Sequence, residues 1–571
     1  MAKKLLKVSG IIVAVVAILL ATAALLLNSD AAQNWLMQRA VGMLKEELQT
    51  EVSVGHVSVS LLKGSVTLSD VEVEDRQHRK MLGIGKLSAA LDLGALWRHE
   101  VVVTNAHISG VKAQLCKPAS PTDSVANYQF LVDALKGHKT HKPHEAHDTL
   151  KTKKPIALRI ATATIDVDSL RYTTDNGRPR RNTGKPHHGA FDAGHLDICT
   201  AMKVTIHSYD TNNANTFQER KPSLNCAVEV RNLTDRIAGI QVDTLLLQAD
   251  ICKDSLQLSD VSIRLPHTSL SFAEGVVVLP DTTTGRKLHY YVPQLSAITQ
   301  IRDIAQPFAP VLKNFTTPLK VKCAFSGDAD GMDFKGVEVA TTDNRLNIKA
   351  TGNIRQLRDK KRLHVHFDVG QMNAQRGMPE RIINHFAVKK FMMKQLHALG
   401  NIGYKGHFDV VPKKESFAGR LRTQHGAIDF RFALDEQNKY VSGTAGTDAL
   451  ELGRIMDMQN LGRIACHADF RFDISKPRTA KMRRLKGGKL PIGNIDAEVR
   501  ECHWKFVAVH NVSATISSDG AEADGKIINR GNFIDLTCKF SFTNTDQMHK
   551  LKVKPGIKIH GKKKKNKDTK K

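Results

Sequence analysis

The residues of this sequence best suited to chemistry are histidines and aspartates at short, regular spacing. His138, His141, His144 and His147 recur at every third position, and neutral imidazole is a common ligand of zinc and other metals. Lysines and Pro143 interrupt the series, and no strand or helix pattern accompanies it to fix a ligand geometry. We therefore interpret the segment as a solvated loop, and the sequence predicts no metal site.

A second candidate is the carboxylate pair Asp166 and Asp168, which a strand would place on one face, as general acid–base chemistry requires. The two aspartates alternate with Ile165 and Val167, however, which is the pattern of a strand with one polar and one apolar face. No nucleophile elbow, phosphate-binding loop, zinc-protease motif or dinucleotide fingerprint occurs. The sequence therefore predicts a protein that is not an enzyme, with no catalytic residues and no cofactor.

Composition and charge indicate a folded chain with anionic partners. Among 571 residues, 41% are hydrophobic and 25% are charged, which excludes a wholly disordered protein. The formal net charge is +27, and much of the excess positive charge lies in residues 550–571, a segment rich in lysine that contains a single acidic residue, Asp568. This tail is either only solubilising, or it attaches the protein to an anionic surface. Its densest cations are Lys562, Lys563, Lys564 and Lys565.

The beginning of the chain predicts one membrane-spanning helix. Residues 11–27 are uncharged and mostly aliphatic, close to the roughly 20 residues that a bilayer requires. Lysines precede them, so the N-terminus is expected in the cytoplasm and the rest of the chain on the far side of the membrane. The alternative is a cleaved signal peptide, with small residues at 21–23 as its cleavage site. The anchor is represented by Ile11, Val16, Leu20 and Leu27.

After a helical pattern at residues 31–50, which would rest on the membrane or cap the first strands, the apolar period changes to two. This alternation predicts strands, seldom longer than ten residues, each with one apolar and one polar face. Helical patterns intervene only at 124–136, 379–399 and 448–459. The clearest apolar faces comprise Leu363, Val365, Phe367, Val369, Ile428, Phe430, Phe432, Leu434, Ile534, Leu536, Phe540 and Phe542.

Residues 63–73 and 253–263 repeat one another around a shared Leu-Ser-Asp-Val sequence. In both copies the apolar phase slips by one at the Ser-Asp step, as a bulge or a tight turn between two short strands would require. The sequence therefore predicts a mainly β fold: an N-terminal transmembrane helix, then an elongated, curled antiparallel sheet forming a β-groove, with a few amphipathic helices.

These patterns divide the chain into eight segments. They are the anchor (1–30), the amphipathic helix (31–50), an N-terminal β region (51–136), a strand segment with polar, basic insertions (137–190), β-groove repeats (191–370), a helical insertion (371–400), further β-groove repeats (401–549) and the basic tail (550–571).

The stretch from Asn34 to Leu115 carries a likeness to a known family. Asn34 and Trp35 open a helix, and short apolar strands follow at 52–58, 64–71, 87–96 and 101–115. This order resembles the N-terminal region of the AsmA-like and TamB-like proteins of Gram-negative bacteria. Residues 127–130 look like the short helical element of the Bacteroidetes branch of that family, and residues 531–559 are similar to its repeats.

The resemblance implies a single-pass anchor in the cell inner membrane, a cytoplasmic N-terminus and a periplasmic body whose long curled sheet has an apolar concave face. It also implies a role in outer-membrane biogenesis, through transport of phospholipid between membranes. The expected partners are phospholipid or another amphipathic lipid, the inner membrane and outer-membrane components. Nucleic acid is not expected as a partner of an exported chain.

An open sheet with one apolar face must bury that face, and acyl chains can cover it in place of protein side chains. The twelve apolar residues named above would then line the lipid-binding groove. Two alternatives stay open at this stage. One is a tethered β-rich structural or binding module whose apolar faces are sealed against each other, and the other is an assembly factor for outer-membrane proteins or lipopolysaccharide balance.

Overall fold

The structure is a computed structural model of the 571-residue chain, described between residues 35 and 559. The gaps in this range are 36, 40, 43–44, 47, 61–63, 97–99, 118–124, 137–156, 175–195, 211–223, 253, 282–284, 309–311, 358, 360, 386–392, 475–491, 506, 521, 532–533 and 546–547. The predicted anchor, the histidine-rich segment, most of the basic insertions and the lysines at 562–565 therefore lie outside the described residues. None of the described helices has the length and hydrophobicity required to cross a bilayer.

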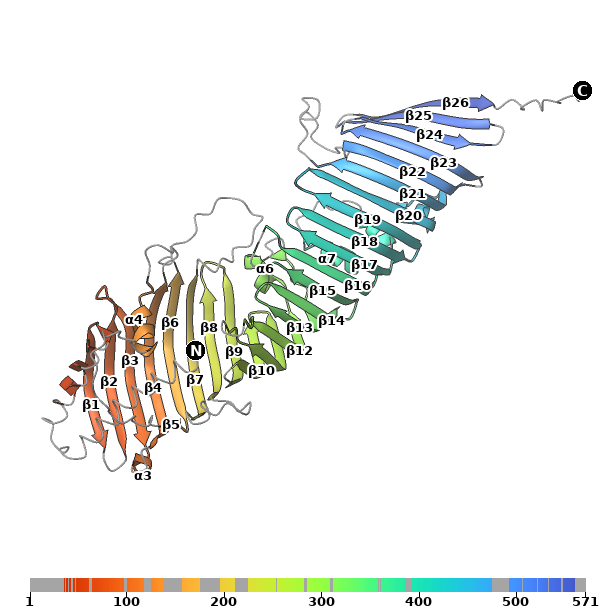
Figure 1. Ribbon diagram of the computed structural model, residues 1–571. Helices are drawn as coiled ribbons and strands as arrows, with labels where there is room; N and C mark the ends of the chain where they lie inside the picture. The colour runs from red at the N-terminus through yellow and green to blue at the C-terminus, as the bar shows by residue number, and fades with distance from the viewer. Residues whose placement is uncertain are drawn as a thin grey trace, which may run out of the picture. The chain divides into compact units, whose positions relative to one another are not determined.

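The chain forms two compact units, Met1–Pro318 (unit 1) and Leu319–Lys571 (unit 2), and both are mainly β, as predicted. Figure 1 shows the strands of each unit side by side in nearly their sequence order. Unit 1 contains β1 (Val52–Ser60), β2 (Ser65–Glu74), β3 (Lys80–Leu91), β4 (Glu100–Lys117), β5 (Ala157–Ile160), β6 (Ala163–Thr174), β7 (Asp197–Asp210), β8 (Leu224–Asp235), β9 (Ile240–Ile251), β10 (Ser255–Leu265), β11 (Thr268–Val278) and β12 (His289–Thr299).

The strands of unit 2 are β13 (Leu319–Asp328), β14 (Gly331–Thr341), β15 (Leu346–Arg355), β16 (His364–Ala374), β17 (Ile402–Val411), β18 (Lys414–Thr423), β19 (Gly426–Asp435), β20 (Tyr440–Glu451), β21 (Leu461–Asp473), β22 (Ile492–Trp504), β23 (Val507–Asp519), β24 (Glu522–Arg530), β25 (Ile534–Thr545) and β26 (Met548–Ile559). In unit 2, each strand from β14 to β25 pairs with the preceding and the following strand.

The sheet is open in both units, because no pairing among the described strands joins β1 to β12 or β13 to β26. The expected antiparallel arrangement is confirmed with one exception. Strand β4 runs parallel to β5 and β6, which both pair with β7. Parallel neighbours require a long connection, and the chain between β4 and β5 supplies it with α4 (Gln129–Lys136) and the residues around that helix.

The repeated Ser-Asp step lies within a continuous strand and is not a turn between two strands. Asp70 in β2 and Asp260 in β10 adopt left-handed backbone conformations, with φ of 56° and 51°, and neither is a cross-strand partner in the pairings of its strand. The register of pairing is unchanged at Asp70 and shifts at this step only between β10 and β9. The expectation of strands seldom longer than ten residues is therefore wrong: β2 and β10 continue through the slip, and β4 runs for 18 residues.

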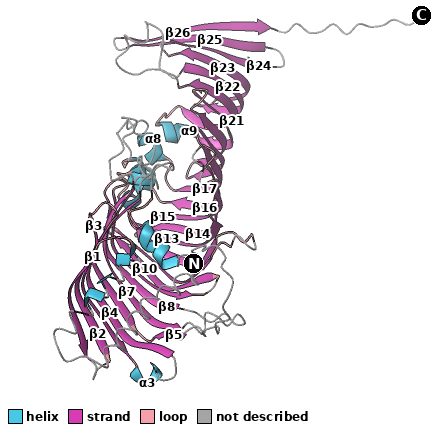
Figure 2. Cartoon of the chain, turned by 60° about the vertical axis from the view of Figure 1, so that its left-hand side comes forward, coloured by secondary structure: helices cyan, strands magenta, loops and turns pink. Residues whose placement is uncertain are grey.

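Helices are short and only partly match the expected segments. In the predicted helix at 448–459, the first residues belong to strand β20 and only α9 (Leu452–Met456) is helical. The predicted helical segment at 379–399 contains two short helices, α7 (Met378–Ile383) and α8 (Met393–Ala398). The sequence patterns did not indicate α3 (Leu93–Leu96) or α6 (Arg302–Phe308). Figure 2 shows α8 and α9 beside the strands of unit 2.

The first strands of unit 1 are sealed by a compact core. Val52, Val73 and Met81 from β1 to β3 and Phe130 from α4 are buried together, at 2–6% exposure. The described residues of the 31–50 segment from Trp35 to Leu48 are helical, and Leu48 packs against this core, which is the capping role considered above. We call these strands with α4 the N-terminal end of unit 1.

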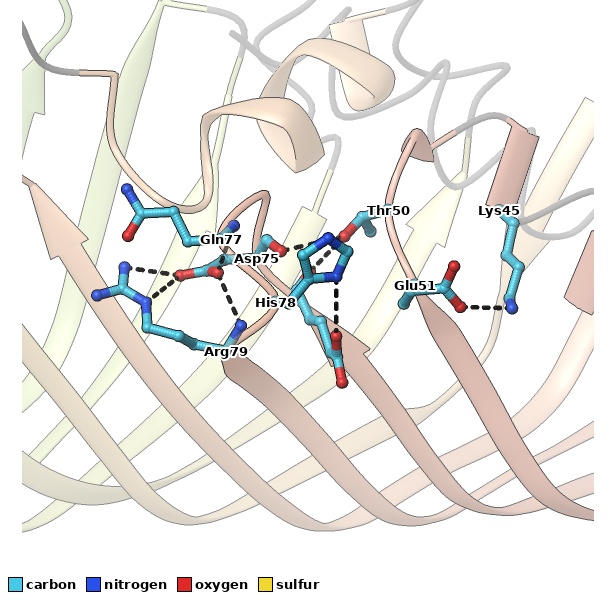
Figure 3. Close-up of polar contacts among 8 residues, drawn as sticks. Lys45, Thr50, Glu51, Asp75, Gln77, His78 and Arg79 are labelled. Carbon is cyan, nitrogen blue, oxygen red and sulfur yellow. Dashed lines mark hydrogen bonds and ion pairs between the residues drawn. The ribbon is translucent and has the colours of Figure 1, made fainter.

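A buried carboxylate fixes the β2–β3 turn at this end (Figure 3). Asp75 is 2% exposed and accepts hydrogen bonds from the backbone nitrogens of Gln77 (2.8 Å) and Arg79 (3.0 Å) and from Arg79 Nε (2.9 Å). Burial alone would raise the pKa of Asp75, but these hydrogen bonds outweigh it and hold the pKa below its usual value. Thr50 Oγ1 donates to the backbone oxygen of Glu74 (2.8 Å) and ties the start of β1 to the same turn.

Candidate functional site

A row of apolar residues crosses unit 2 at right angles to its strands. Each strand from β13 to β26 contributes one residue, and each residue is the direct cross-strand partner of the next. In order, the phenylalanine row is Phe325, Phe334, Gly352, Phe367, Phe408, Phe417, Phe432, Gly443, Phe470, Ile495, Ile516, Gly525, Phe540 and Val553.

The rings of the row touch from strand to strand. Phe367 and Phe408 are stacked with their centroids 5.5 Å apart, and the same separation is 6.1 Å from Phe408 to Phe417 and from Phe417 to Phe432. Phe334 reaches the ring of Phe367 at 5.8 Å across the intervening strand β15. These distances lie within the range of favourable aromatic pairs, so the row presents a continuous aromatic surface over β14 to β19.

Glycines in the row are the positions that rings cover. A Cβ on Gly352 or on Gly525 would overlap the ring of Phe367 or of Phe540, and a Cβ on Gly443 would lie 2.8 Å from Phe470 Cζ. A glycine in a strand interior often marks a place where another group must approach the backbone closely. Here the approaching group is the phenylalanine of the next strand, which closes the gap that glycine leaves in the apolar surface.

The described side chains of the row up to Phe540 are only partly buried, and Val553 on the last strand is 52% exposed. Full burial on this face occurs to one side of the row, where Met378 of α7 is 0% exposed. It packs with Leu346, Ala374 and Ile402 from the ends of β15, β16 and β17. Helix α7 therefore covers the margin of the apolar face over these strands and leaves the row beside it uncovered.

Unit 1 has a corresponding row with a different composition. Its cross-strand partners from β1 to β4 and from β6 to β9 are all aliphatic. They are Val57, Leu68, Leu87, Ile108, Ile165, Val204, Val228 and Leu247. Continuous apolar rows are thus common to both units, whereas the aromatic surface belongs to unit 2.

Most of the groove residues expected from the sequence share the face of the phenylalanine row. Phe367, Phe432 and Phe540 belong to the row, and the others in β16, β19 and β25 lie an even number of positions away on the same strands. Leu363 differs, because β16 begins only at His364. Their exposure varies from 6% at Val369 to 48% at Leu536.

The opposite face of the same strands is polar. His366 Nδ1 donates to Asp409 Oδ1 (2.7 Å), and His364 Nε2 lies 3.1 Å from the same oxygen. The hydrogen bond with Asp409 raises the pKa of His366, although burial opposes it. For Asp409, burial acts to raise the pKa, but the hydrogen bonds from both histidines hold it below the usual value. The cluster links β16 to β17 on the polar face.

The described residues do not support the carboxylate pair or the metal site that the sequence analysis considered. Asp166 lies on the polar face of β6, opposite Lys203 and 3.6 Å from His107 Nε2, as an outward-facing strand position should. Among the residues that the structure describes, no three histidine, cysteine or acidic side chains are placed to hold a metal ion.

The sequence analysis missed several members of the row. Phe334, Phe408 and Phe470 have polar neighbours on both sides, and Phe325 and Phe417 have a serine on one side and an alanine on the other. That alternation was a usable signal for each strand alone. No signal in one strand indicates which residue of the next strand lies opposite, so the row itself could not be found from the sequence.

Comparisons with other proteins add no further constraint. The sequence matches no protein-family model, and a search of curated proteins gives no match.

Proposed function

We propose that this protein carries phospholipid or a similar amphipathic lipid along the apolar faces of its sheets. The observation that supports the proposal is the unbroken phenylalanine row, whose side chains have neighbours from strand to strand but are left partly exposed. Acyl chains would cover the row, and headgroups would stay at the polar margin of the sheet.

Simple energetics support this proposal. Burying one methylene group contributes about 0.8 kcal/mol, so a lipid tail gains many times that value wherever it lies on an apolar surface. Neighbouring strands are about 4.8 Å apart, so a row that crosses β13 to β26 extends over roughly 60 Å. A tail that moves along such a row exchanges equivalent apolar contacts, which keeps barriers to movement low, and no chemical step is required.

We further propose that the chain belongs with the AsmA-like and TamB-like proteins. In this proposal it is held by one N-terminal span in the cell inner membrane, with its body in the periplasm as an apolar β-groove, and it acts in outer-membrane biogenesis. The sequence of residues 34–115 and the open, mainly β architecture of both units support the assignment.

A charge placed in the row tests the proposal. Phe432→Asp puts a carboxylate in the middle of the aromatic surface, and Ala433→Asp puts the same group on the opposite face of β19. The full-length chain is extracted with a mild detergent, and the phospholipid retained per chain is measured by mass spectrometry. We expect several lipids per wild-type chain, a several-fold loss in Phe432→Asp and little change in Ala433→Asp.

Two results would contradict the proposal. Well-folded wild-type protein without lipid would indicate a tethered binding or structural module instead. Equal lipid retention in Phe432→Asp and Ala433→Asp would show that lipid binds away from the row.

A further inference from the structure

A hollow lies on the polar face of unit 2, behind the phenylalanine row. It has a volume of about 870 Å³ and is bordered by strands β16 to β21. Lys405 of β17, Arg420 and Arg422 of β18, and Arg431 of β19 line it together with a single carboxylate, Asp429. Its four cations alternate along their strands with residues of the apolar face, of which Tyr404 and Phe430 also border the hollow.

Most of the positive charge in this hollow has no acidic partner within the described part of the chain. Arg420 Nη1 pairs with Asp429 Oδ2 at 3.3 Å. Among the described residues no ion pair involves Lys405, Arg422 or Arg431. Some other cations of unit 2 are paired with acids of neighbouring strands, as in the pairs Lys349–Glu338 (3.0 Å), Arg463–Glu501 (3.6 Å) and Lys414–Asp435 (3.6 Å). Of the four cations around the hollow, only Arg420 has such a partner among the described residues.

The arrangement also opposes folding. Lys405 is the direct cross-strand partner of Arg420, and like charges in directly opposite positions destabilise a sheet. Arg431 follows Asp429 by two residues and is therefore the diagonal neighbour of Arg420. Strand pairing does not account for this concentration of cations, whereas a bound anion would.

The hollow has room for such an anion because glycine stands beside the cations. Gly403 is the cross-strand partner of Arg422 and has no left-handed φ that would demand glycine. The atoms nearest to a Cβ at this position would be Asn373 Oδ1 at 3.6 Å, Arg422 Cβ at 3.7 Å and the backbone oxygen of Met372 at 3.8 Å, which are ordinary contacts. Neither backbone conformation nor packing thus requires glycine here, and its absent side chain leaves open space next to Arg422.

We propose that this hollow binds a phosphate-bearing anion, held by Arg422 and Arg431 with Lys405 as a third charge. Guanidinium groups donate paired hydrogen bonds that match phosphate oxygens, and lysine adds a mobile point charge. The phosphate belongs either to a soluble compound or to a lipid headgroup. The inference does not depend on the lipid-carrying role of the apolar face, because the two surfaces lie on opposite sides of the sheet.

The test measures binding of inorganic pyrophosphate to the full-length chain in an uncharged detergent by calorimetry at low salt. We expect saturable binding to the wild type and at least tenfold weaker binding to the double variant Arg422→Gln/Arg431→Gln. Gly403→Leu, which fills the hollow without removing charge, should weaken binding similarly. Arg463→Gln removes a paired cation of the same unit and should bind as the wild type does.

The source of the phosphate is distinguished by a second arm with vesicles of phosphatidylglycerol or of phosphatidylcholine. If the wild type binds phosphatidylglycerol vesicles more strongly than phosphatidylcholine vesicles, and the double variant loses this preference, the phosphate belongs to a lipid headgroup. If pyrophosphate binds but the two kinds of vesicle bind equally, the phosphate belongs to a soluble compound. The proposal is overturned if pyrophosphate does not saturate the wild type, or if the double variant binds it as tightly. Amide hydrogen-exchange protection in β17 to β19 that equals the wild-type value shows that a variant is folded. If Gly403→Leu is not folded, the double variant alone decides the test.

Discussion

The N-terminal end of unit 1 and the last strands of unit 2 share an alternation of apolar and polar residues, but their apolar faces differ in burial. In β1 to β3 the alternating apolar residues are buried under α4, with Val52 at 3% and Phe130 at 5% exposure. In β26 the corresponding residues Leu551, Val553 and Ile557 are 62%, 52% and 71% exposed. The comparison shows that alternation decides which residues share a face, and that the segments between strands decide whether this face is buried.

The physical basis of the difference is the presence of a cover. Helix α4 is amphipathic and brings Phe130 and Leu131 onto the first strands of unit 1, so that apolar area there leaves water within the protein. No described helix plays that part over β22 to β26. The apolar face of these strands therefore keeps its affinity for an external apolar molecule.

The largest contrast is expected from one substitution made at both places. Phe130→Ala should cost about 3–5 kcal/mol of local stability, because it leaves a cavity in a sealed core. Phe540→Ala removes a ring that is partly exposed already and should cost about 1 kcal/mol or less. Amide hydrogen exchange of β1 to β3 and of β24 to β26 measures the two local values. Similar losses in the two regions would mean that Phe540 is covered in solution and would break the comparison.

An intermediate effect is expected at the β2–β3 turn. Asp75→Asn removes a buried charged acceptor and should destabilise the N-terminal end by about 2 kcal/mol at neutral pH. Because the folded pKa of Asp75 is depressed, its contribution is complete above the usual carboxyl pKa of about 3.9. It disappears as the pH falls through the lower folded pKa.

Hydrogen exchange of the turn between pH 3 and pH 7 measures this dependence. The wild type should lose protection on acidification, and Asp75→Asn should show a flatter profile. Glu72→Gln is a suitable control, since its exposed pair with Lys80 belongs to the same strands. If Asp75→Asn keeps the acid dependence of the wild type, a group other than Asp75 causes the loss of protection at low pH.

The smallest difference should come from glycine. Gly64 has φ of 57°, and a Cβ there would lie 2.8 Å from the backbone oxygen of Leu91, so Gly64→Ala should cost about 1–2 kcal/mol. In Gly525→Ala the added methyl meets only the ring of Phe540, which has space to rotate away. We expect a loss below about 1 kcal/mol, together with changed fluorescence of a reporter placed near Phe540. A larger loss at Gly525 than at Gly64 would show that the uncovered face is rigid.

Several features of the fold were predictable from the sequence because they depend on local patterns of residues. Alternation placed Phe367, Phe432 and Phe540 on apolar faces because side-chain direction in a strand has a period of two. The slip of the apolar phase at Asp70 was also visible in the sequence, and the structure places a left-handed residue there. Both signals are local, and local patterns survive in a single sequence.

Features that join distant segments were not predictable in this way. The parallel pairing of β4 with β6 depends on a crossover, and the direct opposition of Phe417 and Phe432 depends on where each turn ends. The cation hollow arises in the same manner, because Lys405 and Arg420 belong to different strands whose register no single strand reveals. Polar residues on the solvent face of a strand look alike in sequence, whether or not their neighbours balance their charge.

Among the described strands of unit 2, each from β14 to β25 pairs only with its two neighbours in sequence, and this has an evolutionary consequence. A sheet without closure has no preferred number of strands, so its length can change by whole hairpins without a new core. Loss of β18 and β19 together, for example, would bring Phe408 beside Gly443, a phenylalanine–glycine pair of the kind that the row already contains at Phe367 and Gly352. Homologous chains should therefore differ in span by pairs of strands, and selection would act on one position per strand.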